Sequence, residues 1–331
     1  MRNTNWTKDL TFDNLYHRVD GLVSVSIVSK EKLIQSIDST DNWDMFFISS
    51  ELFEKFDRYL VPLYPDIIDA FRGQRTGWND MFVIPASKVA ESGIERRFLV
   101  PYVKSPVELK TLEFNGDYEN YLFVCDLPIA DLKIKYKGAY KWISRFKYAK
   151  NKNGKKTIQE ACEANNPFWY TLKPKQAHIV TAINPFERFF FCYAKTPFTI
   201  DQRLVAITVN DYNDIELISA LLNSIVTLLN IEMRGTSRNL GALDLNANYF
   251  KTLKVLNPNV LTTFAQREIK KAFRPLKNRE IETIFDEFRK PDRTNFDKVV
   301  LRSFGIDEKI LPSLYRILST AVYDRVSMKE R

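Results

Sequence analysis

Two glycines, Gly73 and Gly77, frame a short polar segment that leads into the apolar run 81–84. Glycine tolerates positive φ and lets another backbone approach closely, so this spacing predicts a tight loop before a buried strand. Arginine, glutamine and asparagine bond phosphates and base edges, and tryptophan stacks on bases. The loop would therefore hold nucleic-acid contacts at an exposed tip, with an ordinary turn as the alternative. The candidates are Arg72, Gln74, Arg75, Thr76, Trp78 and Asn79.

A second set of candidates lies in the basic segment 131–175, which holds twelve Lys or Arg against three Asp or Glu. Its balance of +9 compares with +8 for the whole chain, so the excess is confined to this segment. A confined excess is the electrostatic footprint of a polyanion site, and a solvated surface loop is the alternative. On a strand, the first three lysines would share one face. The candidate cations are Lys133, Lys135, Lys137, Lys141, Arg145, Lys147, Lys152, Lys155 and Lys156.

Aromatic side chains are interleaved with these cations and could stack on bases. Trp142 and Phe146 are four residues apart, however, which also suits one face of a helix that packs on a core. We expect core positions for this pair and for Trp169.

A third set follows a predicted helix. Apolar residues recur at helical spacing from Ile218 to Leu229, and Asn213 is placed to cap the N-terminus of this helix. The helix should end near Gly235, where a polar loop begins. Loops held by a rigid helix often carry function, although a solvated turn explains the same residues. The candidates are Arg234, Ser237, Arg238 and Asn239.

The pattern of elements indicates an α+β fold. Residues 66–210 contain short β-branched or aromatic runs between Pro, Gly, Asn and Asp, at 98–103, 121–125, 168–172, 178–183, 188–194 and 204–209. Apolar stripes at helical spacing fill 258–331. We therefore expect an N-terminal connector or docking segment at 1–65, with a strand in 22–28. An irregular, mostly antiparallel, β-rich domain would follow at 66–257, and a C-terminal helical segment at 258–331.

The segment Gly73-Gln-Arg-Thr-Gly-Trp-Asn-Asp-Met-Phe-Val-Ile84 resembles the G-x-x-T-G-x-N-x-x-F-x-I motif of N6-adenine DNA methyltransferases of restriction–modification systems, of the TaqI-like kind. In that family the motif opens the target-recognition domain. Later segments resemble the family in the same order: 97–105, 221–224, 232–235, 240–245, 279–281, 292–293 and 304–305. The resemblance spans roughly residues 65–331 and implies recognition of a short double-stranded DNA sequence.

Two motifs that such a methyltransferase needs are missing from this sequence. There is no glycine-rich S-adenosylmethionine loop, and Asn166-Pro-Phe and Asn184-Pro-Phe lack the second proline of the Asn-Pro-Pro-aromatic motif. The resemblance therefore implies that catalysis, the cofactor S-adenosylmethionine and base flipping belong to a separate methyltransferase catalytic subunit. This chain would be a specificity subunit or one half of a divided enzyme, with no cofactor of its own.

Two other functions remain open. A Mg²⁺-dependent endonuclease would use paired carboxylates and a lysine, for which Glu108, Lys110 and Asp66 are candidates. A protein-interaction scaffold without DNA contact is the other, although the basic segment argues against it. Three cysteines and two histidines without metal-ligand spacing indicate a reducing cytoplasm. The apolar stretch 217–231 is too short and too polar to cross a membrane.

Overall fold

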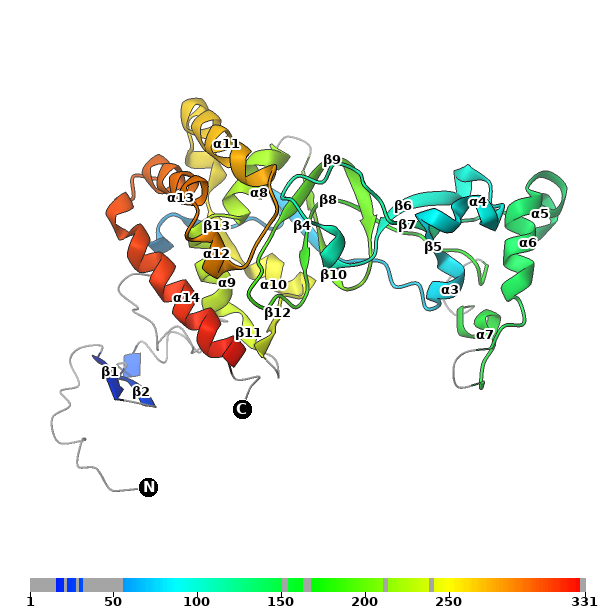
Figure 1. The fold of residues 1–331 in the computed structure, drawn as a ribbon, viewed down its shortest axis with the longest axis horizontal. Coiled ribbons are helices and arrows are strands. Elements are labelled where there is room, and N and C mark those ends of the chain that lie inside the picture. The colour runs from blue at the N-terminus through cyan, green and yellow to red at the C-terminus, as the bar shows by residue number, and fades with distance from the viewer. Residues whose placement is uncertain are drawn as a thin grey trace, which may run out of the picture.

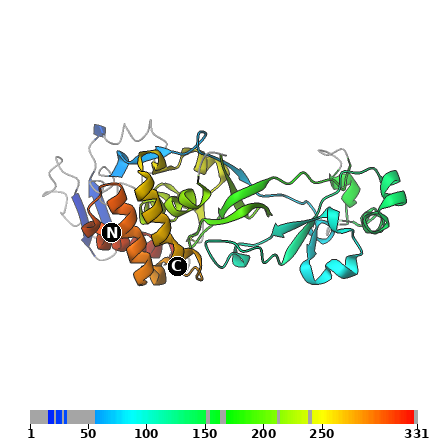
Figure 2. The same ribbon diagram turned by 90° about the horizontal axis from the view of Figure 1, so that it is seen from above.

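The computed structural model describes residues 16–20, 23–27, 30–31, 56–150, 154–162, 168–210, 214–237 and 241–327. The molecule is elongated, with C-terminal helices at one end and a narrower extension at the other (Figures 1 and 2). We call residues 78–102 and 120–172 the arm, and the other described residues from 56 onward the body.

A seven-stranded sheet runs from the body into the arm, in the order β4-β10-β8-β9-β6-β7-β5. All neighbours are antiparallel except β6 and β9, which pair in parallel through Tyr102 with Thr199 and Val103 with Ile200. The α+β fold with a mostly antiparallel sheet is therefore confirmed. The strands are β4 (Ile68–Arg72), β5 (Val83–Pro85), β6 (Leu99–Val103), β7 (Asn120–Phe123), β8 (Gln176–Ala182), β9 (Cys192–Ile200) and β10 (Leu204–Val209).

One expected strand is absent from the described part of the arm. Residues 168–172 form a turn, which the Thr171 amide closes by donating to the Phe168 carbonyl at 3.0 Å. The strand expected at 188–194 begins only at Cys192. Three further two-stranded pairs are β1 (Tyr16–Asp20) with β2 (Val23–Ile27), β3 (Leu60–Pro62) with β13 (Lys254–Leu256), and β11 (Thr236–Ser237) with β12 (Leu243–Asp244). The strand expected within 22–28 is thus present as β2.

Side chains of this sheet contribute to two separate hydrophobic cores. The body core contains buried side chains from Phe56 to Val322, so it includes residues on both sides of position 257. The arm core contains buried side chains from Met81 to Leu172. Around the arm core lie α3 (Asn79–Phe82), α4 (Val89–Ser92), α5 (Ile129–Lys135), α6 (Lys137–Phe146) and α7 (Ile158–Cys162).

The apolar helix expected at 213–234 is two helices, α8 (Ile215–Leu222) and α9 (Ile225–Arg234), bent by 57°. Asp214, rather than Asn213, caps α8 by accepting from the Leu217 amide, and Asn213 lies outside the described residues. Asn223 causes the break, because its side chain accepts from the Phe191 amide at 3.0 Å and donates to the Phe191 carbonyl at 2.9 Å. Among the described residues, no single helix has the length and apolarity of a membrane span, and this bent pair meets those criteria only when taken together.

The remaining helices are α10 (Ala247–Thr252), α11 (Thr263–Lys277), α12 (Ile284–Glu287), α13 (Pro291–Ser303) and α14 (Leu311–Ser327). Of these, α11 packs on α8 and α14 on α9, while α13 packs on α11 and α10 on strand β4. A buried ion pair joins α14 to α9, where Arg325 contacts Glu232 at 2.7 Å, and a second lies within α13, where Arg293 contacts Asp297 at 2.7 Å. Asp297 also accepts from the Ile225 amide at 2.9 Å, which ties α13 to the start of α9.

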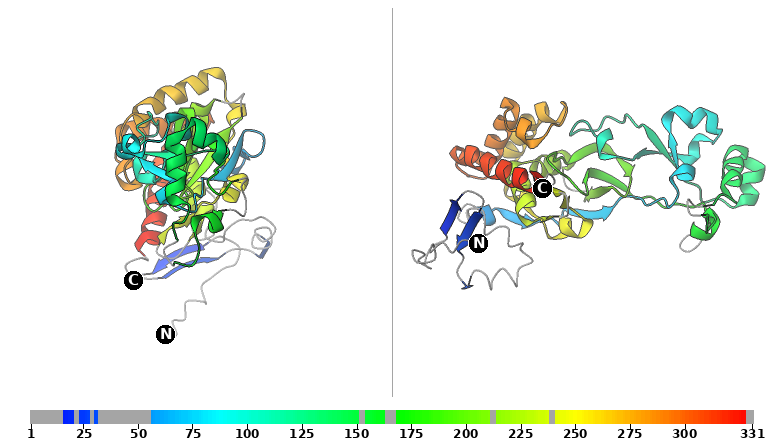
Figure 3. Two further views of the ribbon diagram at one scale, coloured as in Figure 1. Left: turned by 90° about the vertical axis from the view of Figure 1, so that its right-hand side faces the viewer. Right: turned by 60° about the horizontal axis from the view of Figure 1, so that its bottom comes forward.

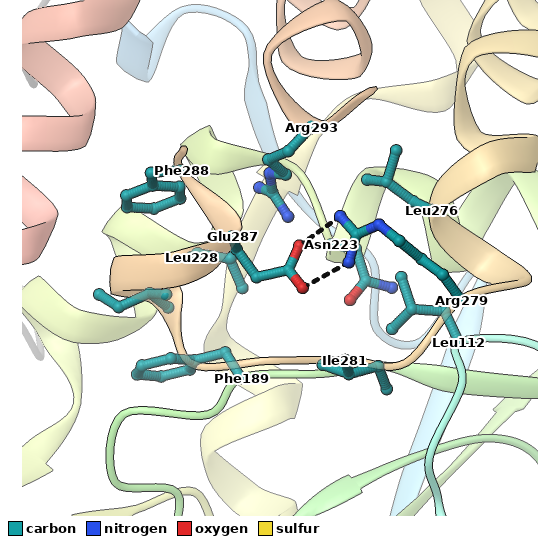
Figure 4. Close-up of a pocket in the computed structure, with 11 residues that line it drawn as sticks. Leu112, Phe189, Asn223, Leu228, Leu276, Arg279, Ile281, Glu287, Phe288 and Arg293 are labelled. Carbon is teal, nitrogen blue, oxygen red and sulfur yellow. Dashed lines mark hydrogen bonds and ion pairs between the residues drawn. The ribbon is translucent and has the colours of Figure 1, made fainter. Parts of the chain in front are cut away.

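A further pair, Arg279 with Glu287, closes over the break between α8 and α9 (Figure 4). The guanidinium donates two hydrogen bonds to the carboxylate, at 2.7 and 2.8 Å. Asn223 and Phe189 line the same small cavity, whose volume of ≈10 Å³ suits one water molecule. The cluster is therefore part of the packing of the body and has no room for a ligand.

Candidate nucleic-acid interface

The basic segment forms the outer end of the arm. Helices α5 and α6 lie at the end of the molecule farthest from the C-terminal helices (Figures 1 and 3). On α6, Ala139 and Ile143 are buried in the arm core. Lys137, Lys141 and Arg145 are spaced by four residues and are all exposed. Because residues four apart share one face of a helix, α6 presents a row of three cations to solvent.

The expected core positions of the aromatic residues are confirmed. The Trp142 indole donates to the Met81 carbonyl at 2.9 Å, and its ring lies 5.1 Å from that of Phe146. Both rings pack against the arm core, and Trp169 is buried within it. Trp142 and Phe146 therefore hold α6 on the arm core, which favours a packing role for them over base stacking.

Helix α6 is also anchored at its N-terminus. The Glu95 carboxylate accepts from the backbone amides of Gly138 and Ala139, each at 2.9 Å. A carboxylate is favoured at a helix N-terminus because the amides there have no partner within the helix. Gly138 allows a close approach, since a Cβ atom there would lie 1.8 Å from the Gly93 carbonyl oxygen. Glu95 thus positions the basic helix, although no motif or charge pattern in the sequence around it indicates this role.

Residues 133–137 do not form a strand, so the condition under which the first three lysines would share one face is not met. Lys133 and Lys135 belong to α5, where residues two apart do not share a face, and both are exposed. Burial of Leu132 on α5, and of Ala139 and Ile143 four residues apart on α6, overrides the local alternation of lysine with apolar residues. The lysines therefore spread around the end of the arm and do not form a single row.

The exposed cations of α5 and α6 are not neutralised within the described part of the chain. No carboxylate there lies in ion-pair range of Lys133, Lys135, Lys137, Lys141, Arg145 or Lys147. Lys155 and Lys156 are exposed on the turn that precedes α7, and Lys152 lies outside the described residues. The arm therefore presents a field of positive charge at the end of the molecule.

The glycine-framed segment lies at the root of the arm and is not an exposed tip, so that expectation is wrong. The Gln74 amide donates to the Ile200 carbonyl at 2.7 Å, and the Gly73 amide donates to the Leu204 carbonyl at 3.1 Å. A Cβ atom on Gly73 would lie 2.1 Å from the Asp201 carbonyl oxygen, so glycine is needed for this close approach. The side chain of Gln74 donates to the neighbouring Arg75 carbonyl at 2.6 Å.

The rest of this segment leads into the arm as a short helix. Thr76 is buried, and its hydroxyl lies 2.6 Å from the Asn79 side-chain oxygen. Trp78 packs on the arm core. Met81 and Phe82 belong to α3, and strand β5 begins only at Val83. The side chains of Arg72 and Arg75 remain exposed, although the Arg72 Nε also donates to the Gln202 carbonyl at 2.9 Å. These two arginines are the residues of the segment that are best placed to contact a ligand.

The side chain of Asp201 also stabilises the root of the arm, through contacts with Tyr102 and Arg203. The Tyr102 hydroxyl donates to Asp201 at 2.8 Å, and Arg203 contacts the same carboxylate at 2.9 Å. Burial, followed by the hydrogen bond to Asp201, raises the pKa of Tyr102 well above its usual range. Tyr102 belongs to the arm core and Asp201 to the body, so this bond joins the two units.

The third candidate set is only partly described. Arg234 is half-buried and lies 3.9 Å from Asp57. Ser237 belongs to β11, while Arg238 and Asn239 lie outside the described residues. The geometry therefore gives Arg234 a role within the body and leaves the loop after it as a prediction.

The residues proposed for a nuclease centre do not form one in the described structure. Glu108 accepts from the Lys104 amide at 3.1 Å and from the Asn120 side chain at 3.4 Å. Burial raises the pKa of Glu108. Within the described ranges, no group of three His, Cys, Asp or Glu residues could hold a metal ion. The carboxylate of Glu108 therefore bonds to the turn that precedes it.

Comparison with known proteins gives a fold for the chain. No family model matches it. The chain is similar to the type IIG restriction endonuclease BpuSI, with a TM-score of 0.64 and 13% sequence identity over 93% of this chain. It covers 36% of that structure, about a third of its length. A second match is the type IIL restriction-modification enzyme MmeI in complex with DNA, with a TM-score of 0.42 and 14% identity over 76% of this chain and 36% of that one. The TM-score of 0.42 with MmeI is too low to support a structural argument. The TM-score of 0.64 with BpuSI shows that this chain shares its fold with part of a restriction endonuclease.

Proposed function

We propose that this chain is the part of a restriction–modification enzyme that binds double-stranded DNA, with the arm as its contact surface. The observation that carries the proposal is the exposed row Lys137, Lys141 and Arg145 on α6, which has no carboxylate partner within the described structure. An uncompensated basic helix face suits the phosphates that border a DNA groove. The fold shared with BpuSI, a restriction endonuclease, supports the same class of function.

The sequence motifs refine this proposal to a target-recognition part of an N6-adenine DNA methyltransferase. In that case a separate methyltransferase catalytic subunit would hold S-adenosylmethionine and flip the target adenine. Arg75, exposed at the root of the arm, is the best candidate of the glycine-framed segment for a base contact, because arginine can bond guanine O6 and N7 together. The buried Thr76 and the internally bonded Gln74 and Asn79 are better explained as supports of that root.

Direct binding to DNA tests the proposal. The triple variant Lys137→Ala/Lys141→Ala/Arg145→Ala should bind a random-sequence duplex more weakly than the native chain, measured by fluorescence anisotropy over a range of salt concentrations. Each lost phosphate contact should also reduce the slope of log K against log salt by about 0.9. Because phosphate contacts carry no direct sequence information, the loss should be similar on every duplex.

A variant of equal charge change controls for net charge. Arg289, Lys309 and Arg316 are exposed cations of the C-terminal helical region of the body. Replacing these three with alanine should leave affinity and salt slope near the native values. Equal losses in both triple variants, or no loss in the arm variant, would reject the arm as the DNA-binding surface.

A further inference from the structure

A second basic surface lies on the body, along α11. Arg267, Lys271 and Arg274 are exposed, and their spacing of three and four residues puts them on one face of the helix. The opposite face of α11 buries Ile269, Phe273 and Leu276 in the body core. The residue pattern of this helix is therefore divided between a core face and a cationic face.

This cationic face borders a groove of ≈350 Å³ next to α8. The groove is lined by Glu216, Arg267, Lys270, Lys271, Arg274 and Lys277. The acidic side of the groove is already neutralised: Glu216 contacts Lys277 at 2.6 Å, and Asp214 contacts Lys270 at 2.5 Å.

The other three cations of the groove have no such partner. Within the described residues, no carboxylate lies in ion-pair range of Arg267, Lys271 or Arg274. Like charges three and four residues apart on one face of a helix repel each other and destabilise the helix. The fold thus keeps a repulsive row on the wall of a groove, and an anionic partner would relieve that repulsion.

The shape of the molecule indicates which kind of anion fits. Helix α11 lies on the body and the basic helices lie on the arm, with the central sheet between them (Figure 1). Two separated basic surfaces on one elongated molecule suit a long polyanion with regularly spaced charges better than a compact one. Duplex DNA has such a backbone, with one charge per about 1.7 Å of axis.

We propose that the α11 row is a second contact surface for the phosphate backbone of duplex DNA, separate from the arm. This inference rests on the proposed function and extends it, because the body then takes part in DNA binding as well as supporting the arm. Contacts of this kind position the protein on the duplex and do not read its sequence.

Salt-dependent binding of the full chain tests the inference. The variant Arg267→Ala/Lys271→Ala/Arg274→Ala should bind a random-sequence duplex roughly tenfold more weakly or worse, and its salt slope should fall by about two to three units. Combination with the triple arm variant should reduce the slope further, because the two surfaces are independent. The variant Arg267→Lys/Arg274→Lys keeps the charge and should keep most of the affinity.

Three controls separate the possible failures. Thermal unfolding shows whether the α11 variant is folded, and the charge-preserving variant must bind if the charge on this face is what matters. If the native chain binds no duplex, both the proposed function and this inference are rejected. If the native chain binds and the arm variant weakens binding, but the α11 variant keeps the native affinity and slope, only this inference is overturned. That last outcome would assign the α11 row to another anionic partner, such as an acidic protein segment.

Discussion

The body and the arm use charged residues in opposite ways. In the body, two ion pairs are buried: Arg293 and Asp297 are 5% and 0% exposed, and Arg325 and Glu232 are 6% and 4% exposed. In the arm, the cations of α5 and α6 are exposed and have no carboxylate partner in the described structure. A buried ion pair fixes one arrangement of helices, because separating it leaves an uncompensated charge away from water. An exposed, unpaired cation does little for the fold and is available to a ligand.

The comparison also separates two kinds of sequence signal. The buried Arg, Asp and Glu residues of the body have structural roles. This holds even for Glu232 and Arg293, which lie in segments that resemble motifs of the methyltransferase family. Exposed cations of the arm and of α11 are the ones that can serve binding. The row on α11 shows that a body residue is not structural by location alone. Exposure and pairing, rather than position in the chain, therefore distinguish the two groups.

The largest effect is expected from breaking a buried pair of the body. The variant Asp297→Ala leaves Arg293 buried without its partner and removes the acceptor for the Ile225 amide. The expected cost is about 3–5 kcal/mol in the free energy of unfolding, measured by urea denaturation. The arm variant Lys141→Ala should change that free energy by no more than about 0.5 kcal/mol.

A double variant keeps this prediction testable if Asp297→Ala does not fold. Arg293→Met/Asp297→Leu removes both charges and fills similar space, so it should be more stable than Asp297→Ala alone. If Asp297→Ala and Lys141→Ala cost the same, the contrast between paired and unpaired charge does not hold.

The next effect concerns the separate cores. Ile143 is 1% exposed in the arm core and Ile207 is 0% exposed in the body core. Each Ile→Ala change should cost about 2–5 kcal/mol, because it removes buried methyl groups and leaves a cavity. We expect Ile143→Ala to speed amide hydrogen exchange in α6 and β7 while β8 and β10 keep their protection. Ile207→Ala should do the reverse.

The opposite outcome would change the description of the molecule. If Ile143→Ala speeds exchange equally in β8 and β10, the arm and the body unfold as one cooperative unit. The two clusters would then be parts of a single core that is joined through β6 and β9.

Local patterns predicted the elements whose causes are local. The runs at 98–103, 121–125, 178–183 and 204–209 are strands, and the apolar stripes predicted within 258–331 include helix α14. The four-residue spacing of Trp142 and Phe146 correctly indicated a helix face on a core. The cationic residues of α5 and α6 could also be identified from the sequence, although no pattern indicated helix α5.

The predictions that were wrong concern features that depend on residues far away in the sequence. Asn223 breaks the helix because it bonds to the backbone of Phe191, which no local pattern around 223 reveals. The segment after Gly73 is a root and not a tip, because it pairs with the turn at Asp201. Both features depend on which distant backbone segment lies beside the residue, and a single sequence does not reveal that contact. The α11 row was also missed, since its charges become informative only when their partners are known.

The smallest of the three effects is expected at the join between the two units. The variant Gly73→Ala places a Cβ atom 2.1 Å from the Asp201 carbonyl oxygen and 2.8 Å from that of Ile200, so the backbone must move. Overpacking of this kind typically costs about 1–3 kcal/mol. The hydrogen bond from the Gln74 amide to Ile200 should weaken, and exchange of that amide should become faster.

The neighbouring variant Gln74→Ala is the matched control. The side chain of Gln74 bonds only to the adjacent Arg75 carbonyl in the described structure, so its loss should cost no more than about 0.5 kcal/mol. If Gly73→Ala is as stable as Gln74→Ala and both keep native exchange at residue 74, the root is not rigid. The arm would then be held to the body by the pairing of β6 with β9 and by the Tyr102–Asp201 hydrogen bond, and the contrast between the two units would extend to their relative motion.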